Sequence, residues 1–200
     1  MKGLALVGVA RFMARRRLPA LIVFDLDACL WLPEMYELST APTTYSATKG
    51  GVAAGGDVVR LFPGAQAVLK QLLTDSSFAS VRVAVASSTT EPAYANRCLE
   101  ALPVDASGQR EERLSDLVEF RQIYPGCKGK QHFPALHKQS GIEYAQMLFF
   151  DDCTYSDNAG EVAACCPGVT CVRTPQGLTE ALFRAGLEAY ANSKGQGGVV

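Results

Sequence analysis

The sequence predicts an α/β fold in which helices cover both faces of a parallel sheet of about five strands. Apolar runs recur along the chain, and each is too short to form a helix. Segments with apolar residues at helical spacing separate these runs. Because such alternation is typical of parallel strands joined by helical crossovers, we expect one layered domain without an internal repeat.

The predicted strands are apolar or β-branched runs that end in polar or turn residues. The first begins at Ala20 and ends at Phe24, and we expect it to be buried on both faces. Further strands are predicted at 81–86, 117–120, 147–150 and 169–172. The first, second and fourth strands are followed directly by acidic or hydroxyl side chains.

Helices are predicted between the strands, at 57–73, 92–102, 131–139, 158–166 and 177–191. Pro92 lies in the first turn of its helix, where proline favours a start, whereas Pro63-Gly64 interrupts the earliest helix. The segment 39–56 is rich in Ser, Thr, Ala and Gly, which indicates either a flexible flap near the strand ends or a plain surface loop. The insertion 32–80 is therefore mostly loop and one helix, and we expect no large cap domain.

The length and charge of the chain limit its organisation and its partners. We expect an N-terminal extension at 1–19, one domain at 20–191 and a flexible tail at 192–200. The net charge of −1 gives no support for nucleic acid or an anionic membrane as a partner. No apolar run reaches the roughly 18 residues of a membrane span.

The seven cysteines are an odd number, and they show neither a CxxC pair nor zinc-ligand spacing. This pattern disfavours a disulfide framework and suits a reducing compartment, so we expect a cytoplasmic protein. The first 20 residues contain no acid and carry several arginines, so a mitochondrial presequence is the alternative.

The polar residues that follow the strands form one constellation at a single edge of the sheet. Four acids, two serines and a lysine belong to it: Asp25, Asp27, Asp151, Asp152, Ser87, Ser88 and Lys128. Converging carboxylates repel one another unless a cation lies among them, and oxygen ligands of this kind suit Mg²⁺. Hydroxyl groups, strand-end amides and a lysine are what a phosphate group requires.

The order of these motifs resembles the haloacid dehalogenase (HAD) superfamily. Four stretches resemble its eukaryotic magnesium-dependent phosphatases: Phe24-Asp25-Leu26-Asp27, Ala86-Ser87-Ser88-Thr89-Thr90-Glu91, Tyr124-Pro125-Gly126-Cys127-Lys128 and Phe149-Phe150-Asp151-Asp152. The similarity extends over about 18–190 and implies a Rossmann-like, HAD-like domain that hydrolyses phosphomonoesters with Mg²⁺.

The resemblance also implies a role for each residue. Asp25 would be the nucleophile that forms an aspartyl-phosphate, and Asp27 would be the general acid and base. Mg²⁺ would be held by the Asp25 carboxylate, the Asp27 carbonyl and the pair Asp151 and Asp152. The phosphoryl group would be bound by Leu26, Ser87, Ser88 and Lys128, and Asn158 would steady the metal loop.

Several residues depart from the pattern of the family. Cys29 replaces a threonine, Ser88 an arginine and Cys153 an acid, which leaves the substrate preference open. Lys130 competes with Lys128 for the phosphate role, and the Tyr-Pro-Gly-Cys-Lys motif favours Lys128. Trp31 is interpreted as a packing residue at the rim of the site.

The expected substrates are phosphotyrosine in a protein or a phosphorylated sugar adduct such as fructosamine 6-phosphate. The alternatives are a HAD-like module that binds phospho-ligands without turnover and a receiver-type phosphoacceptor. A cysteine-dependent phosphatase is disfavoured because no cysteine is followed six positions later by arginine. Cys29, Cys127 and Cys153 lie beside the motifs and suggest either a redox-sensitive site or small residues in tight loops.

Overall fold

The computed structural model describes residues 17–105, 112–193 and 195–200 of the chain. Most of the proposed N-terminal extension, and with it the possible presequence, lies outside the described residues. Among the helices described, none is long and apolar enough to cross a membrane.

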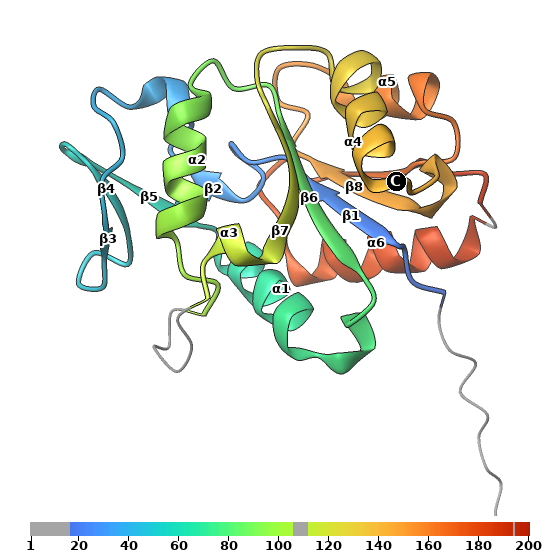
Figure 1. The fold of residues 1–200 in the computed structure, drawn as a ribbon, viewed down its shortest axis with the longest axis horizontal. Helices are drawn as coiled ribbons and strands as arrows, with labels where there is room; N and C mark the ends of the chain where they lie inside the picture. Colours follow the sequence, from blue (N-terminus) through green and yellow to red (C-terminus); the bar gives the residue numbers. More distant parts are fainter. Residues whose placement is uncertain (1–16, 106–111, 194) are drawn as a thin grey trace, which may run out of the picture.

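The main sheet has six strands in the order β10-β9-β8-β1-β6-β7, and all of its pairs are parallel. Its strands are β1 (Leu21–Phe24), β6 (Arg82–Ser87), β7 (Val118–Ile123), β8 (Met147–Asp151), β9 (Thr170–Arg173) and β10 (Gly198–Val199). The predicted parallel sheet is confirmed, and β1 lies in its interior between β6 and β8 (Figure 1).

The tail at 192–200, which was expected to be flexible, includes a short strand, because the chain returns to the sheet as β10. The Gly198 amide donates to the Val169 carbonyl at 3.1 Å, and the Val200 amide donates to the Cys171 carbonyl at 2.8 Å. These bonds use only backbone groups, so the glycine-rich composition of the tail gave no sign of the strand.

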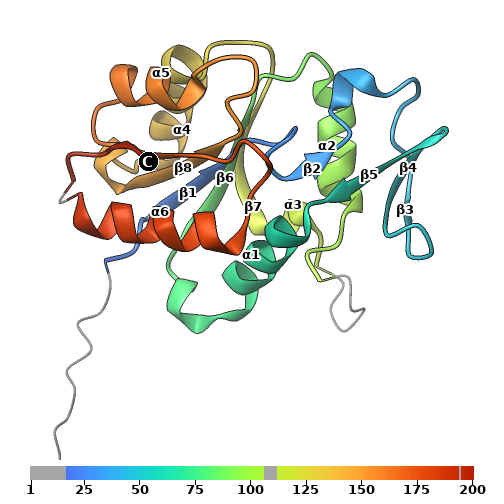
Figure 2. The ribbon, with the colours of Figure 1, turned by 180° about the vertical axis from the view of Figure 1, so that it is seen from behind.

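Helices cover both faces of the sheet, because successive side chains of a strand point to opposite sides. Ile22 and Phe24 of β1 belong to one buried cluster, and Leu21 and Val23 belong to the other. The first cluster is covered by α1 (Pro63–Thr74), α2 (Pro92–Ala101), α3 (Leu114–Leu117) and α6 (Glu180–Asn192). The second is covered by α4 (Phe133–Ser140) and α5 (Asn158–Cys165), on the opposite side of the sheet (Figure 2).

A second, antiparallel sheet replaces the expected loop and the start of the first predicted helix. Its order is β2-β5-β4-β3, with β2 (Trp31–Leu32), β3 (Tyr45–Ser46), β4 (Gly51–Ala54) and β5 (Asp57–Leu61). Gly55 and Gly56 form the two-residue turn of the β4–β5 hairpin, and Gly55 has a φ of 60°, which such turns require. Helix α1 consequently begins at Pro63, and the small sheet projects at one end of the molecule (Figure 1).

Short one-turn helices complete the connections. They are η1 (Met35–Glu37), η2 (Ser76–Phe78), the π-helical turn η3 (Lys128–His132) and η4 (Tyr144–Gln146). The third of these turns carries Lys128 and leads directly into α4. The carboxyl ends of β1, β6 and β8 therefore meet η1 and η3 at one edge of the main sheet.

Candidate active site

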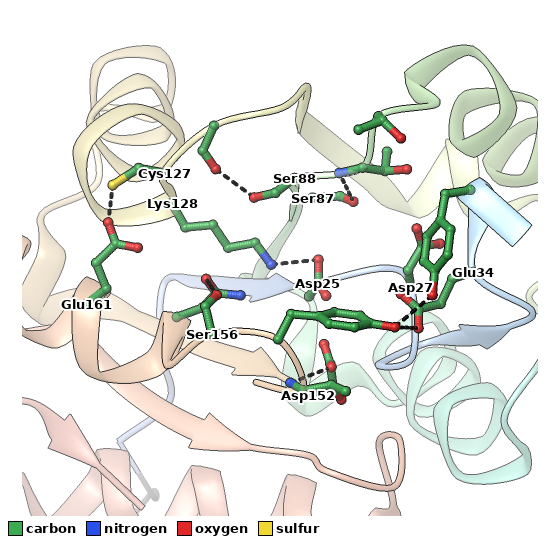
Figure 3. Close-up of a pocket in the computed structure, with 17 residues that line it drawn as sticks. Asp25, Asp27, Glu34, Ser87, Ser88, Cys127, Lys128, Asp152, Ser156 and Glu161 are labelled. Atoms are coloured by element: carbon green, nitrogen blue, oxygen red, sulfur yellow. Dashed lines mark hydrogen bonds and ion pairs between the residues drawn. The ribbon is translucent and has the colours of Figure 1, made fainter.

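The predicted constellation lines or adjoins a pocket of about 420 Å³ at the carboxyl ends of the central strands (Figure 3). Open parallel sheets bind ligands at this edge. Asp25, Asp27, Ser87, Ser88 and Lys128 all line the pocket. The structure thus brings together side chains from three strands and one helical turn.

A buried acidic triad lies at the base of the pocket. Asp25, Asp151 and Asp152 each offer a carboxylate oxygen, and these oxygens lie within 4.8 Å of one another. Asp151 is fully buried, and Asp25 and Asp152 are 6% and 8% exposed. Three buried carboxylates at such distances need a compensating cation, since burial of unpaired charge is costly.

Lys128 supplies one positive charge to the triad. Its ammonium Nζ lies 2.7 Å from Asp25 Oδ1 and 2.5 Å from Asp151 Oδ2 (Figure 3 shows the side chain pointing to Asp25). Burial opposes this charge, but Asp25 and Asp151 outweigh burial and raise the pKa of Lys128. Lys130 is exposed on the same turn, so the structure places Lys128 at the acids, as the motif indicated.

The charge balance of the triad fits a divalent cation. Burial raises the pKa of Asp25 well above its usual value; Lys128 opposes this shift, and Asp151 adds to it. One ammonium leaves the three carboxylates short of neutrality, and hard oxygen ligands are those that Mg²⁺ prefers. The residues present therefore fit Mg²⁺ held by Asp25, Asp151 and Asp152.

The loop that holds the metal-binding acids is fixed by local hydrogen bonds. Asn158 Nδ2 donates to Asp151 Oδ1 at 3.0 Å, and the Cys153 amide donates to the same oxygen at 2.9 Å. The Thr154 amide donates to Asp152 Oδ2 at 2.8 Å. Asn158 thus contacts the metal loop at the position where a steadying residue was expected.

Asp27 lies at the start of a tight loop that follows β1. Ala28 adopts a φ of 57°, and the Leu30 amide donates to the Leu26 carbonyl at 2.8 Å, so the chain turns back on itself. This turn places Trp31 Nε1 at 2.7 Å from Asp27 Oδ1. Burial raises the pKa of Asp27, and the bond from Trp31 opposes that shift.

Trp31 packs in the core, as predicted, since it is fully buried, but it also donates this hydrogen bond to Asp27. Its position four residues after Asp27 gave no indication of contact, since the left-handed Ala28 was not expected. The side chain of Leu26 is buried in the core, and Leu26 is not among the residues that line the pocket. Only its backbone is available for a ligand role.

The serines after β6 lie on the side of the pocket near Lys128. Ser87 is buried, and its Oγ accepts a bond from the Thr89 amide at 3.4 Å. Ser88 Oγ donates to the Gly126 carbonyl at 2.8 Å. The side chain of Ser88 is therefore engaged in holding the loop before Lys128, which leaves its amide for a ligand.

His132 joins the two loops that flank the phosphate side, a role that the sequence did not suggest. Its Nε2 lies 3.0 Å from the Tyr124 carbonyl and 3.2 Å from the Ser87 carbonyl, and its ring stacks on Tyr124 at 4.2 Å. Burial lowers the pKa of His132, although the backbone carbonyls oppose that effect. Through these contacts the ring holds the ends of β6 and β7 together.

The cysteines beside the motifs are shielded from reactivity. Cys29 Sγ donates to the Phe150 carbonyl at 3.6 Å and accepts from Thr174 Oγ1 at 3.4 Å. Burial raises the pKa of Cys29, a bond to Glu161 raises that of Cys127, and burial raises that of Cys153 to about 11. Since the thiolate is the reactive form, these shifts disfavour a redox-sensitive site.

Six further pocket residues were missed by the sequence analysis: Glu34, Tyr36, Thr154, Tyr155, Ser156 and Glu161. Glu34 and Tyr36 belong to the segment around η1, and Tyr155 follows the acids of β8. These segments are far apart in the sequence, so no motif or spacing indicated that they meet.

Comparison with known proteins gives consistent matches over nearly the whole chain. Residues 17–193 match the acid phosphatase family. Human "Magnesium-dependent phosphatase 1" is 35% identical over 182 residues, which cover 89% of this chain and 90% of that protein. A "HAD-like hydrolase superfamily protein" of Schizosaccharomyces pombe is 32% identical over 136 residues, covering 67% of this chain and 76% of the relative.

Solved structures share the fold at low sequence identity. The phosphatase domain in the N-terminal part of a Bacteroides fragilis protein, complexed with Mg, superposes with a TM-score of 0.54 at 16% identity, covering 88% of this chain and 40% of that chain. A haloacid dehalogenase-like hydrolase from Xanthomonas campestris gives a TM-score of 0.53 at 16% identity, covering 86% and 96%. At such identities these two likenesses support the fold alone.

Proposed function

The chain belongs to the acid phosphatase family and is a HAD-family magnesium-dependent phosphatase, and from this premise we propose that Asp25 forms an aspartyl-phosphate during phosphomonoester hydrolysis. One observation carries the proposal. Asp25 directly follows β1 and lines the pocket, where it is paired at 2.7 Å with the buried Lys128 and lies within reach of the other two acids. An aspartate so placed can approach phosphorus from the base of the pocket.

The first step transfers the phosphoryl group to Asp25. A carboxylate oxygen of Asp25 bonds to phosphorus as the bond to the leaving oxygen breaks, and Asp27 gives its proton to that oxygen. Burial raises the pKa of Asp27, which favours the protonated form that this step needs. Bound Mg²⁺ supplies positive charge that offsets repulsion between the anionic nucleophile and the phosphate.

The second step releases inorganic phosphate. Asp27, now ionised, accepts a proton from water as the water oxygen attacks phosphorus, and the Asp25 carboxylate leaves. Ser87, the Ser88 amide, the Leu26 backbone and Lys128 hold the phosphoryl oxygens through both steps. Trp31 helps to hold Asp27 in place by donating a hydrogen bond to one of its carboxyl oxygens.

The substrate proposed for this site is protein phosphotyrosine or a phosphorylated sugar adduct. The pocket is bordered by short segments, among them the stretch around η1 and the loops after β6 and β8, so a phosphate on a larger molecule can enter. The cytoplasm is the location we propose, because all seven cysteines are free thiols.

The mechanism is tested with p-nitrophenyl phosphate, with Mg²⁺ and with a chelator. We expect chelator-sensitive turnover that is abolished in Asp25→Asn and in Lys128→Met. Lys130→Met is the matched control, since this lysine lies on the same turn but is exposed, and it should keep wild-type activity. Thermal unfolding of each variant shows whether it is folded.

Two other outcomes contradict the proposal. Stable phosphorylation of the wild type without turnover indicates a receiver-type phosphoacceptor. Binding of phosphate esters with neither phosphorylation nor turnover indicates a module that only binds phospho-ligands.

A further inference from the structure

A pair of tyrosines joins two distant segments at the mouth of the pocket. The hydroxyl oxygens of Tyr36 and Tyr155 lie 2.7 Å apart, although 119 residues separate them in the sequence. The rings meet edge to face, with centroids 6.4 Å apart and an angle of 76°. Tyr155 also donates its hydroxyl proton to Glu34 Oε1 at 3.1 Å, so both rings are fixed in orientation.

Both tyrosine rings are exposed, so packing in the core does not account for their positions. Tyr36 is 55% exposed and Tyr155 is 72% exposed, whereas large apolar residues of the core are almost fully buried. Among the described residues, Leu32, Val199 and Val200 are the other exposed large hydrophobics, and none of these three lines the catalytic pocket. Exposed aromatic side chains gathered at one pocket are typical of a ligand-binding surface.

The tyrosine pair lies near the place of one part of the substrate, the group attached to the leaving oxygen. Ser87, Ser88 and Lys128 lie on the phosphate side of the pocket, and Asp27 lies where the leaving oxygen must receive its proton. Figure 3 shows Glu34 beside Asp27, across the pocket from Cys127 and Glu161. Since Glu34 holds Tyr155, the tyrosine pair lies on the side to which the group attached to the leaving oxygen must extend.

We propose that Tyr36 and Tyr155 form a leaving-group subsite that selects phosphate esters of planar, aromatic groups over those of small aliphatic alcohols. This inference rests on the proposed function for its catalytic part. Aromatic rings bind each other through edge-to-face or offset stacking, and a fixed ring loses little conformational entropy when it does so. The hydroxyl bonds to each other and to Glu34 orient the rings, so Glu34 acts as a positioning residue.

The test compares phenyl phosphate with glycerol 2-phosphate as substrates. Tyr36→Ala and Tyr155→Ala should each raise the KM for phenyl phosphate by roughly 2- to 12-fold, the range expected for loss of one aromatic pair. Their KM for glycerol 2-phosphate and their kcat for both esters should change by less than about twofold, because the chemistry lies elsewhere. The Phe variants keep the rings and should retain most of the preference for phenyl phosphate.

Leu32→Ala is the matched control, because Leu32 is 43% exposed in the neighbouring segment but does not line the pocket. It should leave both KM values unchanged. An equal rise in KM for both esters in the Ala variants, or no rise for either, overturns the subsite.

A binding measurement separates this proposal from the catalytic one. Phenylphosphonate cannot be hydrolysed, and it should bind wild-type protein more tightly than methylphosphonate does, with the difference lost in Tyr155→Ala. If the wild type hydrolyses neither ester, the proposed function fails, and the two phosphonates still decide the subsite. Equal affinity of the wild type for both phosphonates refutes the subsite, whatever the activity.

Discussion

Trp31→Phe tests whether the proton transfer by Asp27 depends on the hydrogen bond that Trp31 donates. Phenylalanine keeps an aromatic ring in the core but removes the Nε1–H group that lies 2.7 Å from Asp27 Oδ1. Trp31 is fully buried, so water does not readily replace the lost donor. The substitution therefore leaves one oxygen of Asp27 without this donor and weakens the hold on a carboxyl group that Met35 and Thr89 also bind.

The size of the effect follows from the bond that is lost. A hydrogen bond to a charged group contributes roughly 1.5–3 kcal/mol, which corresponds to about a 10- to 150-fold change in rate. Complete loss of general acid catalysis, about 10²- to 10⁴-fold, is the upper bound. Only esters whose leaving group needs a proton will show this loss.

The assay measures kcat/KM, which reports the first chemical step, for two esters. For glycerol 2-phosphate, a poor leaving group, kcat/KM should fall about 10- to 150-fold in Trp31→Phe. For p-nitrophenyl phosphate, whose leaving group is stable as an anion, we expect a fall of less than about threefold. Asp27→Asn should show the same dependence on the leaving group to a larger extent.

Leu30→Val is the control for damage to the loop. Leu30 is buried next to Trp31 in the sequence, and its side chain has no polar atom that could bind the Asp27 carboxyl group. It should lower the unfolding temperature without changing the ratio of the two kcat/KM values. Equal losses for both esters in Trp31→Phe refute the reasoning. So does a double variant with Asp27→Asn whose losses simply add, because residues that act through one another are not additive.

Three further predictions concern the metal loop, the core and pH. Asn158→Ala removes a bond to Asp151 and should raise the Mg²⁺ concentration for half-maximal activity at least about tenfold, measured by metal titration. Gly186→Ala should lower the free energy of unfolding by about 1–3 kcal/mol in urea, because an added Cβ would lie 2.8 Å from Phe150 Cζ. Burial lowers the pKa of His132 below the unfolded value of about 6.5, so the unfolded chain binds more protons and stability should be lost as pH falls below about 6.5. His132→Gln should remove this pH dependence in thermal unfolding, whereas His137→Gln should keep it.

The positions of Asp25, Ser87 and Asp151 could be predicted because they depend on the sheet alone. The strands β1, β6 and β8 are short, apolar and fully or mostly buried, and each ends where polar residues begin. Parallel pairing in register then brings these ends to one edge, as the pairing of Phe24 with both Val85 and Phe150 shows. Asp25, Ser87 and Asp151 follow from that register without further information.

The small antiparallel sheet could not be predicted in the same way, because its strands are very short and weakly apolar. Two of them have only two residues each, too few to show an alternating pattern. The hairpin signal was present in Gly55-Gly56, but the surrounding Ser, Thr and Ala residues obscured it. Val58 and Val59 fit either a strand or a helix, and the sequence analysis assigned them to a helix. The structure places them in β5, and the helix begins only at Pro63.

The residues that could be predicted are those proposed for the chemical steps. The residues that could not be predicted are those proposed for the selection of the substrate. In the proposed mechanism, Asp25 and Lys128 act on the phosphoryl group, which every substrate shares, and their positions depend on the sheet and on a motif. Tyr36 and Tyr155 meet only because two loops cross at the mouth of the pocket, and their contact is made by exposed side chains. Exposed contacts of this kind can change at small cost to stability, since surface substitutions usually alter it by less than about 0.5 kcal/mol. Changes at these two tyrosines should therefore alter the choice of substrate while the hydrolysis itself remains intact.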